Sequence, residues 1–267
     1  MNNYPIVVIF GGGGFIGRYL VRNLTKKNFR CIVPTRNPFS KGYLKTQAPP
    51  GAIEIINFST KNLDQIKNAI NNSDFVINLC GILYESRKQK FNTIHTDLPE
   101  TIANLCAQSD IKKFVHVSAI GANKESKSKY QQSKFFGEEK ALNNFKNTVV
   151  IRPSVVCGSE DNFTNLFSKL SVSPVIPVVN MNYKFQPIFV NDVARAILKA
   201  IEIKNNEGKI YEIGGEKIIS LGDMVKLILK IIGKKRLVVE MPMTLAKAQG
   251  TLLSLLPIPP ILTRDQC

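Results

Sequence analysis

The chain has 267 residues, with 36 Lys and Arg against 20 Asp and Glu, 44% apolar residues and no Trp. This length suits one large domain or a domain with a smaller appendage, and the composition excludes a disordered tail, a fibre and a multi-span membrane protein. The net charge of +16 favours contact with phosphates, anionic lipid or an acidic partner, and no helix-turn-helix or zinc-finger spacing points to nucleic acid.

Short apolar runs alternate with amphipathic segments through the N-terminal half of the chain. The expected strands are residues 6–10, 31–33, 53–56, 75–79, 114–117 and 148–151, and the expected helices are 15–24, 63–70, 98–107 and 133–143. This alternation is typical of βαβ units around a parallel sheet. The sequence therefore predicts an α/β fold with a Rossmann doubly wound sheet, and residues 1–155 form the predicted NAD(P)-binding domain.

The texture changes after Arg152, where prolines interrupt a less periodic stretch. A helix is expected near residues 192–201, a strand near 210–213 and a helix near 221–232. We expect residues 156–267 to form a smaller C-terminal part, partly interleaved with the sheet, that caps the cleft at the strand ends. Doubly wound folds hold their ligands in that cleft.

Neither end of the chain predicts a membrane span. The first strand begins almost at the N-terminus, so we expect no signal or transit peptide. The uncharged stretch 248–263 is too short to cross a bilayer and contains three prolines, so we expect it to lie on a membrane or against protein.

Cysteine and histidine spacing predicts neither a metal site nor a disulfide framework. The five cysteines are widely spaced without a Cys-x-x-Cys, and His95 and His116 are 21 positions apart without ligand-like neighbours. We therefore expect no metal and a reducing compartment. Cys31, Cys80 and His116 lie in apolar runs, which favours packed roles.

A glycine-rich loop directly follows the first predicted strand and opens a helix. Gly11, Gly14 and Gly17 have dinucleotide-binding spacing, with Phe15 and Ile16 between the last two. Glycines permit a tight turn close to a pyrophosphate, and the free N–H groups of the helix N-terminus face its negative charge. The sequence therefore predicts that these five residues bind the cofactor.

The residue after the second strand indicates which cofactor binds. A carboxylate for the ribose 2′-hydroxyl is expected about 20 residues past the glycines. The chain instead has Arg36 there, and its first acidic residue is Glu54. An arginine can bind a 2′-phosphate in bidentate fashion, which favours NADP(H) over NAD(H).

Tyr130 and Lys134 are four residues apart and therefore share one face of a predicted helix. A lysine beside a phenol lowers the phenol pKa, which would let Tyr130 exchange a proton with a carbonyl or alcohol oxygen during hydride transfer. We predict both residues as catalytic and as cofactor-binding.

Together these motifs resemble the extended and atypical short-chain dehydrogenase/reductase superfamily. Further matches are the strand-end segment that includes Cys80 and Gly81, Val117-Ser118, Arg152-Pro153 and Phe189-Val-Asn-Asp-Val193. The resemblance implies a Rossmann core and adds Ser118 to the catalytic residues, and Cys80 and Gly81 to the cofactor-binding residues.

More narrowly, the chain is similar to the family of the NADPH-binding accessory subunit of respiratory complex I and its bacterial relatives. The blocks that carry this similarity are Gly81-Ile-Leu-Tyr-Glu, Gln89-Lys-Phe, His116-Val-Ser-Ala-Ile-Gly-Ala122, Glu160-Asp-Asn-Phe163, Phe185-Gln-Pro187 and Leu262-Thr-Arg-Asp-Gln266. The resemblance implies bound NADPH, a role linked to ubiquinone respiration, and complex I or a membrane surface as partner. It implies a location in the bacterial cytoplasm, with peripheral attachment to the inner membrane, or in the mitochondrial matrix if the source is a eukaryote. Relatives are expected to continue past Cys267, where a short natural form and a truncated one are both open.

The sequence leaves catalysis open. In the superfamily an active-site hydroxyl follows the fifth strand by two or three positions, and this chain has Ala119 and Ile120 there. The first hypothesis is a binding or structural role. The alternative is a soluble NAD(P)-dependent oxidoreductase or epimerase that uses Tyr130 and Lys134 on a small carbonyl or nucleotide-sugar substrate. A third is a redox sensor.

Overall fold

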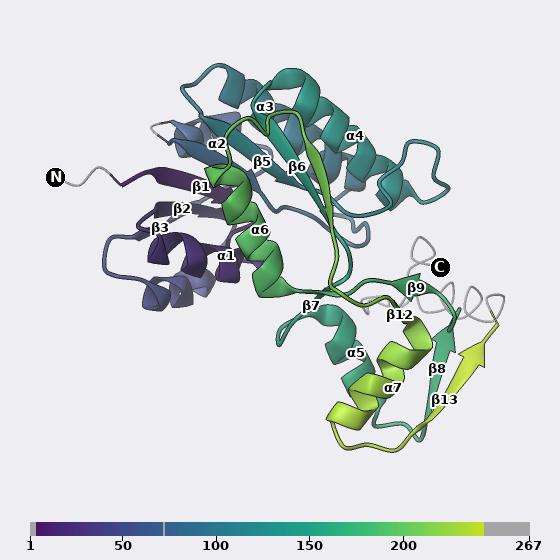
Figure 1. The fold of residues 1–267 in the computed structure, drawn as a ribbon. Helices are drawn as coiled ribbons and strands as arrows, with labels where there is room; N and C mark the ends of the chain where they lie inside the picture. Colours follow the sequence, from purple (N-terminus) through teal and green to yellow (C-terminus); the bar gives the residue numbers. More distant parts are fainter. Residues whose placement is uncertain (1–3, 72, 243–267) are drawn as a thin grey trace. The chain divides into compact units, whose positions relative to one another are not determined.

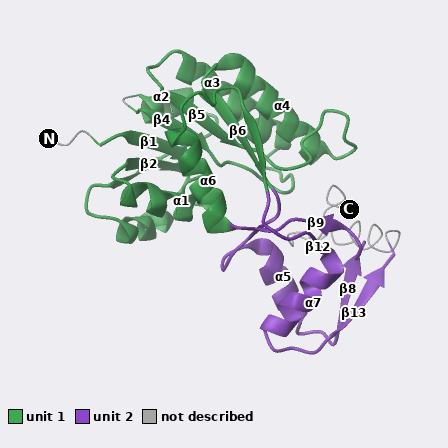
Figure 2. Cartoon of the chain, in the orientation of Figure 1, with its two compact units in different colours: residues 1–153, 190–213 green, residues 154–189, 214–267 purple. Residues whose placement is uncertain are grey.

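The computed structural model describes residues 4–71 and 73–242. Within this part the chain divides into two compact units, with boundaries after Pro153, Phe189 and Ile213 (Figure 2). The first unit contains the N-terminal segment and residues 190–213, and the second contains residues 154–189 and the segment that follows 213.

A seven-stranded parallel sheet forms the centre of the first unit (Figure 1). Its spatial order is β11 (Ile210–Ile213), β6 (Thr148–Pro153), β5 (Lys113–Val117), β4 (Phe75–Asn78), β1 (Ile6–Phe10), β2 (Arg30–Thr35) and β3 (Ile53–Asn57). The connections run outward in opposite directions from β1 and β4, which is the doubly wound arrangement. The predicted fold class is confirmed, because all seven predicted strands pair in this one sheet.

Five α-helices accompany this sheet in the described part of the first unit. They are α1 (Phe15–Lys26), α2 (Leu63–Ile70), α3 (Leu98–Ala107), α4 (Lys129–Asn144) and α6 (Val190–Glu202). Helix α4 begins four residues before its predicted start, because the Ser128 side chain accepts a hydrogen bond from Gln131 N and caps the helix. Helix α6 lies against α1, where Asn23 Nδ2 donates to Asn191 Oδ1 at 3.0 Å.

Two helical segments of the first unit were not predicted. A 3₁₀ segment, Phe39–Gln47, follows β2, and a π-helical turn, Asn92–Asp97, leads directly into α3. Ile94 of the π-helical turn continues the apolar stripe of α3, and both segments adjoin the site described below.

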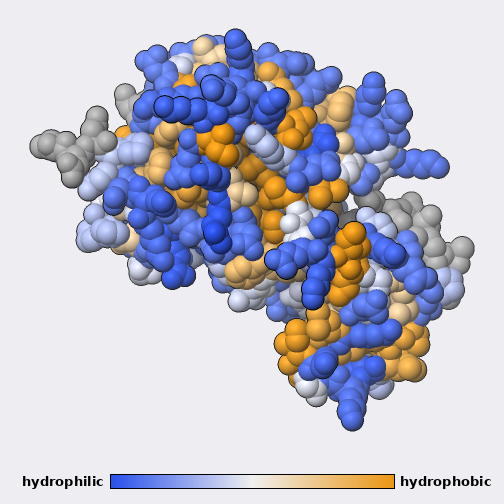
Figure 3. All heavy atoms as spheres, in the orientation of Figure 1, coloured by the Kyte–Doolittle hydropathy of each residue, from blue (hydrophilic) through white to orange (hydrophobic). Residues whose placement is uncertain are grey.

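The described residues of the second unit form two helices and several short strands. The helices are α5 (Asn162–Leu170) and α7 (Leu221–Ile231), and the strands are β7 (Val156–Cys157), β8 (Val175–Val179), β9 (Lys184–Phe185), β10 (Ile188–Phe189), β12 (Ile219–Ser220) and β13 (Leu237–Met241). Strands β8 and β13 form a parallel pair. Phe167, Ile176 and Val225 are among the residues of its separate core. Apolar side chains also gather on the surface of this unit, with polar side chains among them (Figure 3).

No helix in the described ranges has both the length and the apolar character needed to cross a membrane. The predicted uncharged stretch 248–263 and the block 262–266 lie outside the described residues. Among the described residues, no group of three or more side chains could hold a metal ion.

Candidate cofactor site

The loop between β1 and α1 leads into a helix N-terminus that no side chain caps. Gly14 is the N-cap of α1, no side chain caps it, and the first turn holds no acidic residue. Gly11 has φ of +80°, and a Cβ at Gly17 would lie 2.4 Å from Gly12 O. Only glycine at position 17 lets the helix lie this close to the loop, which leaves backbone N–H groups directed at an incoming anion.

The 3₁₀ segment after β2 covers the outer side of this loop. Tyr43 Oη donates to Gly13 O at 3.1 Å, and Lys41 Cδ lies 2.9 Å from the place that a Cβ on Gly13 would occupy. The guanidinium of Arg18 lies 5.3 Å from the Tyr43 ring centroid. Tyr43, Lys41 and Arg18 were not identified as site residues from the sequence. The signal available for Lys41 was its position as a basic residue shortly after the second strand.

The ends of β2 and β4 lie near one another beside the loop. A Cβ on Gly11 would be 3.1 Å from Cys80 N. Burial raises the pKa of the Cys80 thiol to about 12, and the positive charges of Lys134 and Arg36 act against that rise. Arg36 itself is exposed, one residue past the end of β2. It is therefore accessible to a ligand and within electrostatic range of the strand ends.

Two fully buried polar side chains hold the backbone after β4. Asn78 Oδ1 accepts a hydrogen bond from Cys80 N at 3.0 Å, and Asn78 Nδ2 lies 3.3 Å from His116 Nδ1. Because the amide donates to Nδ1, a neutral His116 carries its proton on Nε2. Within the described residues, neither His116 Nε2 nor the buried Ser118 Oγ has a hydrogen-bond partner.

His95 connects this backbone to the helix that carries Tyr130. Ile82 N donates to His95 Nε2 at 3.0 Å, so the proton of the neutral ring is on Nδ1, which lies 2.9 Å from Ser133 Oγ. Ser133 Oγ in turn donates to Tyr130 O at 2.7 Å. The His95 ring stacks on Phe91 and meets the Tyr130 ring edge to face at 5.3 Å.

Both buried histidines are neutral. Burial, followed by the charge of Lys134, lowers the pKa of His95 to about 3. The same two causes, in the same order, lower the pKa of His116 well below its usual value, and His95 adds to the effect. The interior of the site therefore holds one cation, Lys134, beside two neutral imidazoles.

Tyr130 and Lys134 lie on α4 as predicted, but their electrostatics differ from the prediction. Lys134 Nζ donates to Val117 O at 3.0 Å, and burial lowers its pKa to about 8, opposed by Glu138 and Cys80. Burial raises the pKa of Tyr130 to about 12. Burial therefore moves the phenol pKa in the direction opposite to the effect predicted for Lys134.

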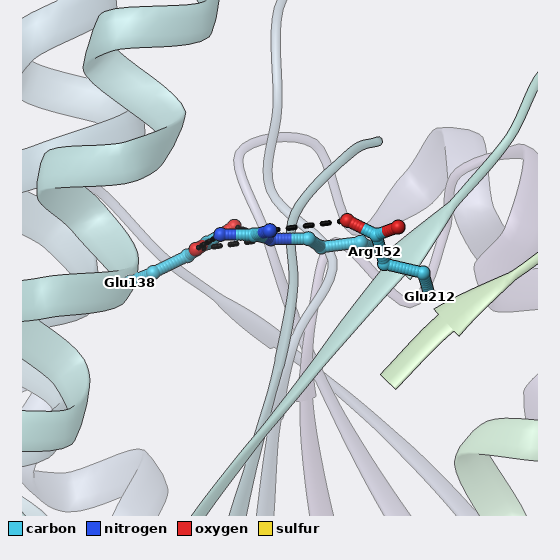
Figure 4. A network of polar contacts seen from close by, with 3 residues as sticks. All are labelled: Glu138, Arg152 and Glu212. Atoms are coloured by element: carbon cyan, nitrogen blue, oxygen red, sulfur yellow. Dashed lines mark hydrogen bonds and ion pairs between the residues drawn. The ribbon is translucent and has the colours of Figure 1, made fainter. Parts of the chain in front are cut away.

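The next turn of α4 holds the helix against the rest of the unit. Glu138 is buried and accepts a two-pronged contact from Arg152, at 2.6 Å from Nη2 and 3.0 Å from Nε (Figure 4). Arg152 Nη1 also donates to Glu212 on β11 at 3.1 Å. A Cβ at Gly137 would lie 1.7 Å from His95 O, so α4 approaches the π-helical turn through this glycine.

The predicted residues therefore gather at the carboxyl edge of one sheet. A Cβ on Gly81 would lie 4.0 Å from Lys134 Nζ, which contacts Val117, the neighbour of Ser118. Ser118 Oγ is buried and forms no hydrogen bond with Tyr130. Ala119 and the 42% exposed Ile120 follow it without a hydroxyl.

Such a site, a bare helix N-terminus at the switch point of a doubly wound sheet, defines a dinucleotide-binding protein. The pattern of the NAD dependent epimerase/dehydratase family matches residues 7–214, and the chain belongs to this family.

Two relatives are mitochondrial NADH dehydrogenase (ubiquinone) 1 alpha subcomplex subunit 9 proteins. The one from Dictyostelium discoideum is 34% identical over 227 residues, which cover 84% of this chain and 63% of the relative. The one from Mus musculus is 29% identical over 264 residues, which cover 98% of this chain and 70% of the relative. The resemblance seen in the motifs is confirmed, and the chain is homologous to this accessory subunit of complex I. It spans about two thirds of these relatives' length.

The fold is shared with the solved structure of UDP-glucuronic acid 4-epimerase from Bacillus cereus in complex with NAD. The TM-score is 0.77 at 20% identity, over 89% of this chain and 87% of the epimerase chain.

Proposed function

We propose that this chain binds NADP(H) and serves as an accessory-type component linked to quinone respiration, without turning over a substrate of its own. The observation that carries the proposal is the end of β5. Ser118 Oγ is buried without a hydrogen-bond partner among the described residues, and Ala119 and Ile120 offer no hydroxyl to polarise a reacting oxygen. The complex I subunits among the relatives support the same role.

The residues at this site fit a dinucleotide cofactor that carries a 2′-phosphate. The proposed cofactor contacts are the backbone at Gly11 and Gly14 and the N–H groups at Phe15, Ile16 and Gly17 for the pyrophosphate, Arg36 for the 2′-phosphate, the backbone at Cys80 and Gly81, and Tyr130 and Lys134 for the nicotinamide ribose. The described part of the β2 end has no carboxylate to favour a free ribose hydroxyl, and Lys41 adds a second cation near the loop.

Replacing Arg36 with alanine is expected to weaken NADPH binding about ten- to a hundredfold and to leave NADH binding nearly unchanged. A charge-assisted contact contributes roughly 1.5–3 kcal/mol, and only the 2′-phosphate loses it. Titration of both cofactors by fluorescence measures the ratio of their affinities. Arg30→Ala, on the same strand but paired with Glu54 at 2.9 Å, is the matched control. Equal losses for both cofactors, or a wild-type preference for NADH, would refute the assignment.

We further propose complex I, or the membrane surface that it occupies, as the partner. This places the chain on the cytoplasmic side of a bacterial inner membrane or in the mitochondrial matrix. The basic surplus of the chain supports attraction to anionic surfaces. Cell fractionation followed by a salt wash tests the location, and protein found wholly in the soluble fraction at low salt would reject it.

A second candidate function is an oxidoreductase, favoured by the state of Tyr130. Because its pKa is raised, the phenol stays protonated and suits a proton donor to a carbonyl oxygen. A bound nicotinamide supplies hydride in such reactions. Lys134 would position the ribose, and Ser118 would supply the hydroxyl at the end of β5.

Tyr130→Phe separates the two candidates. For an accessory component, respiratory activity and assembly should stay unchanged in a complemented deletion strain. Gly14→Val should impair both, because a Cβ there lies 3.1 Å from Gly11 O and closes the phosphate site. For an enzyme, Tyr130→Phe should abolish NADPH consumption over a panel of quinones, aldehydes and nucleotide sugars while NADPH affinity persists. Robust turnover that Tyr130→Phe removes would favour the enzyme.

A further inference from the structure

One end of the second unit exposes an unusual concentration of apolar side chains. Val172 is 81% exposed, Ile231 75% and Leu237 62%. Val175, Leu227 and Ile232 are also exposed. Large aliphatic side chains this open to water cost free energy in a free protein, and a contiguous group of them marks a surface that meets another apolar phase.

Backbone contacts show that these side chains share one end of the unit. The turn after α5 meets the turn after α7, because Leu237 N donates to Pro174 O at 3.0 Å, and Leu237 is in register with Val175. Leu227 and Ile231 are four residues apart on α7 and project from the same helix face.

Cations surround this apolar group, and the two described segments that form it contain no carboxylate. The segments 169–175 and 227–237 contain Lys169, Lys230, Lys234, Lys235 and Arg236 but no Asp or Glu. None of these five cations forms an ion pair with a described residue. We call these five cations and the six apolar residues the tip patch.

Ser171 holds two of these cations in place. This buried residue accepts from Lys234 Nζ at its Oγ, at 3.1 Å, and from Arg236 Nε at its backbone oxygen, at 2.8 Å. Both charges are thus fixed beside the exposed Leu237 and Val172 by a neutral partner, which leaves their positive charge uncompensated.

We propose that the tip patch docks the second unit on a bilayer that contains anionic lipids. Aliphatic side chains enter the boundary between headgroups and acyl chains, and the surrounding lysines and arginine meet the lipid phosphates. An acidic protein surface would pair with the cations, but it would not offer an apolar environment to a side chain as exposed as that of Val172. The proposal deepens the membrane location proposed above and rests on it only for the place in the cell. It does not depend on the cofactor.

The test is co-sedimentation of the full chain with vesicles of phosphatidylglycerol and phosphatidylcholine, and with vesicles of phosphatidylcholine alone. We expect binding to the anionic vesicles that falls at high salt, and little binding to the neutral ones. Ile231→Ser with Leu237→Ser, and separately Lys230→Glu with Lys235→Glu, should each lower the bound-to-free ratio about tenfold or more. All four side chains are at the surface, so thermal melting and NADPH affinity should stay at wild-type values.

Matched controls distinguish binding through the tip patch from nonspecific apolar adsorption and from an effect of net charge alone. Phe39→Ser with Ile218→Ser removes two exposed apolar residues elsewhere, and Lys124→Glu with Lys127→Glu changes the net charge equally on the first unit. Both controls should bind vesicles as the wild type does. Equal binding by the tip variants, equal loss in the controls, or binding to an acidic protein but to no vesicle would each overturn the proposal. Loss of vesicle binding with intact NADPH binding would leave the cofactor assignment untouched.

Discussion

Lowering the pH from 7 to 5 is expected to reduce the free energy of unfolding by about 4 kcal/mol. The chain has two histidines, and both are buried with pKa values below the usual 6.5. Below about pH 6.5 the unfolded chain binds a proton at each imidazole, and the folded chain excludes it. The contribution of the two histidines to the free energy of unfolding is therefore fully present above that pH. As the pH falls, each histidine loses about 1.4 kcal/mol of it for every pH unit.

Urea unfolding at pH 5, 5.5 and 6 measures this slope directly. The window lies above the ordinary titration range of carboxylates, so it reports the imidazoles. His95→Gln should halve the slope, because the amide oxygen can still accept from Ile82 N and only one proton-binding site remains. A slope that corresponds to one proton or none in the wild type would mean that a histidine is charged in the folded protein.

Replacing Glu138 with alanine is expected to cost about 3 kcal/mol of unfolding free energy. The Glu138 side chain is 2% exposed and the Arg152 side chain 16%. Loss of the Glu138 carboxylate therefore leaves a largely buried guanidinium with one remaining partner. That partner, Glu212, is 55% exposed and lies 3.1 Å away. Glu212→Ala, which removes the solvent-screened half of the network, should cost less than about 1 kcal/mol.

The same substitution should act on Lys134, one helical turn away. Glu138 raises the pKa of Lys134 against the effect of burial, so Glu138→Ala should lower that pKa further below about 8. A larger fraction of Lys134 is then neutral at pH 7, and NADPH affinity should fall more steeply with pH in the variant. Unfolding curves and NADPH titrations over pH measure both effects. Equal costs for Glu138→Ala and Glu212→Ala would contradict the account.

The sheet could be predicted because its strands are short apolar runs that only a buried parallel sheet accommodates. The glycine loop and Arg36 were found from spacing alone, since a pyrophosphate imposes that spacing. The surroundings of Tyr130 were not predictable in this way. Its raised pKa depends on burial beside Phe91 and His95, and the sequence does not show that the π-helical turn and the residue before it pack against Tyr130.

The sequence gives no signal of the bonds that His95 forms with Ile82 and Ser133, because they follow from tertiary packing. The contact of Gly137 with that turn has the same origin, because a glycine within a helix does not reveal in sequence which neighbour it admits. The short strands of the second unit escaped notice because two residues carry no periodic signal.

The division of the chain has a consequence during synthesis on the ribosome. The first unit is completed only when α6 and β11 have emerged, after the whole of residues 154–189. Until then β6 lacks its outer neighbour, and the face of α1 that receives α6 is bare. At roughly 5–20 residues per second this nascent form persists for several seconds, with an open strand edge exposed to wrong partners. A fragment that stops at Pro153 would stay in that state, so the nucleotide-binding unit cannot be completed without residues 190–213.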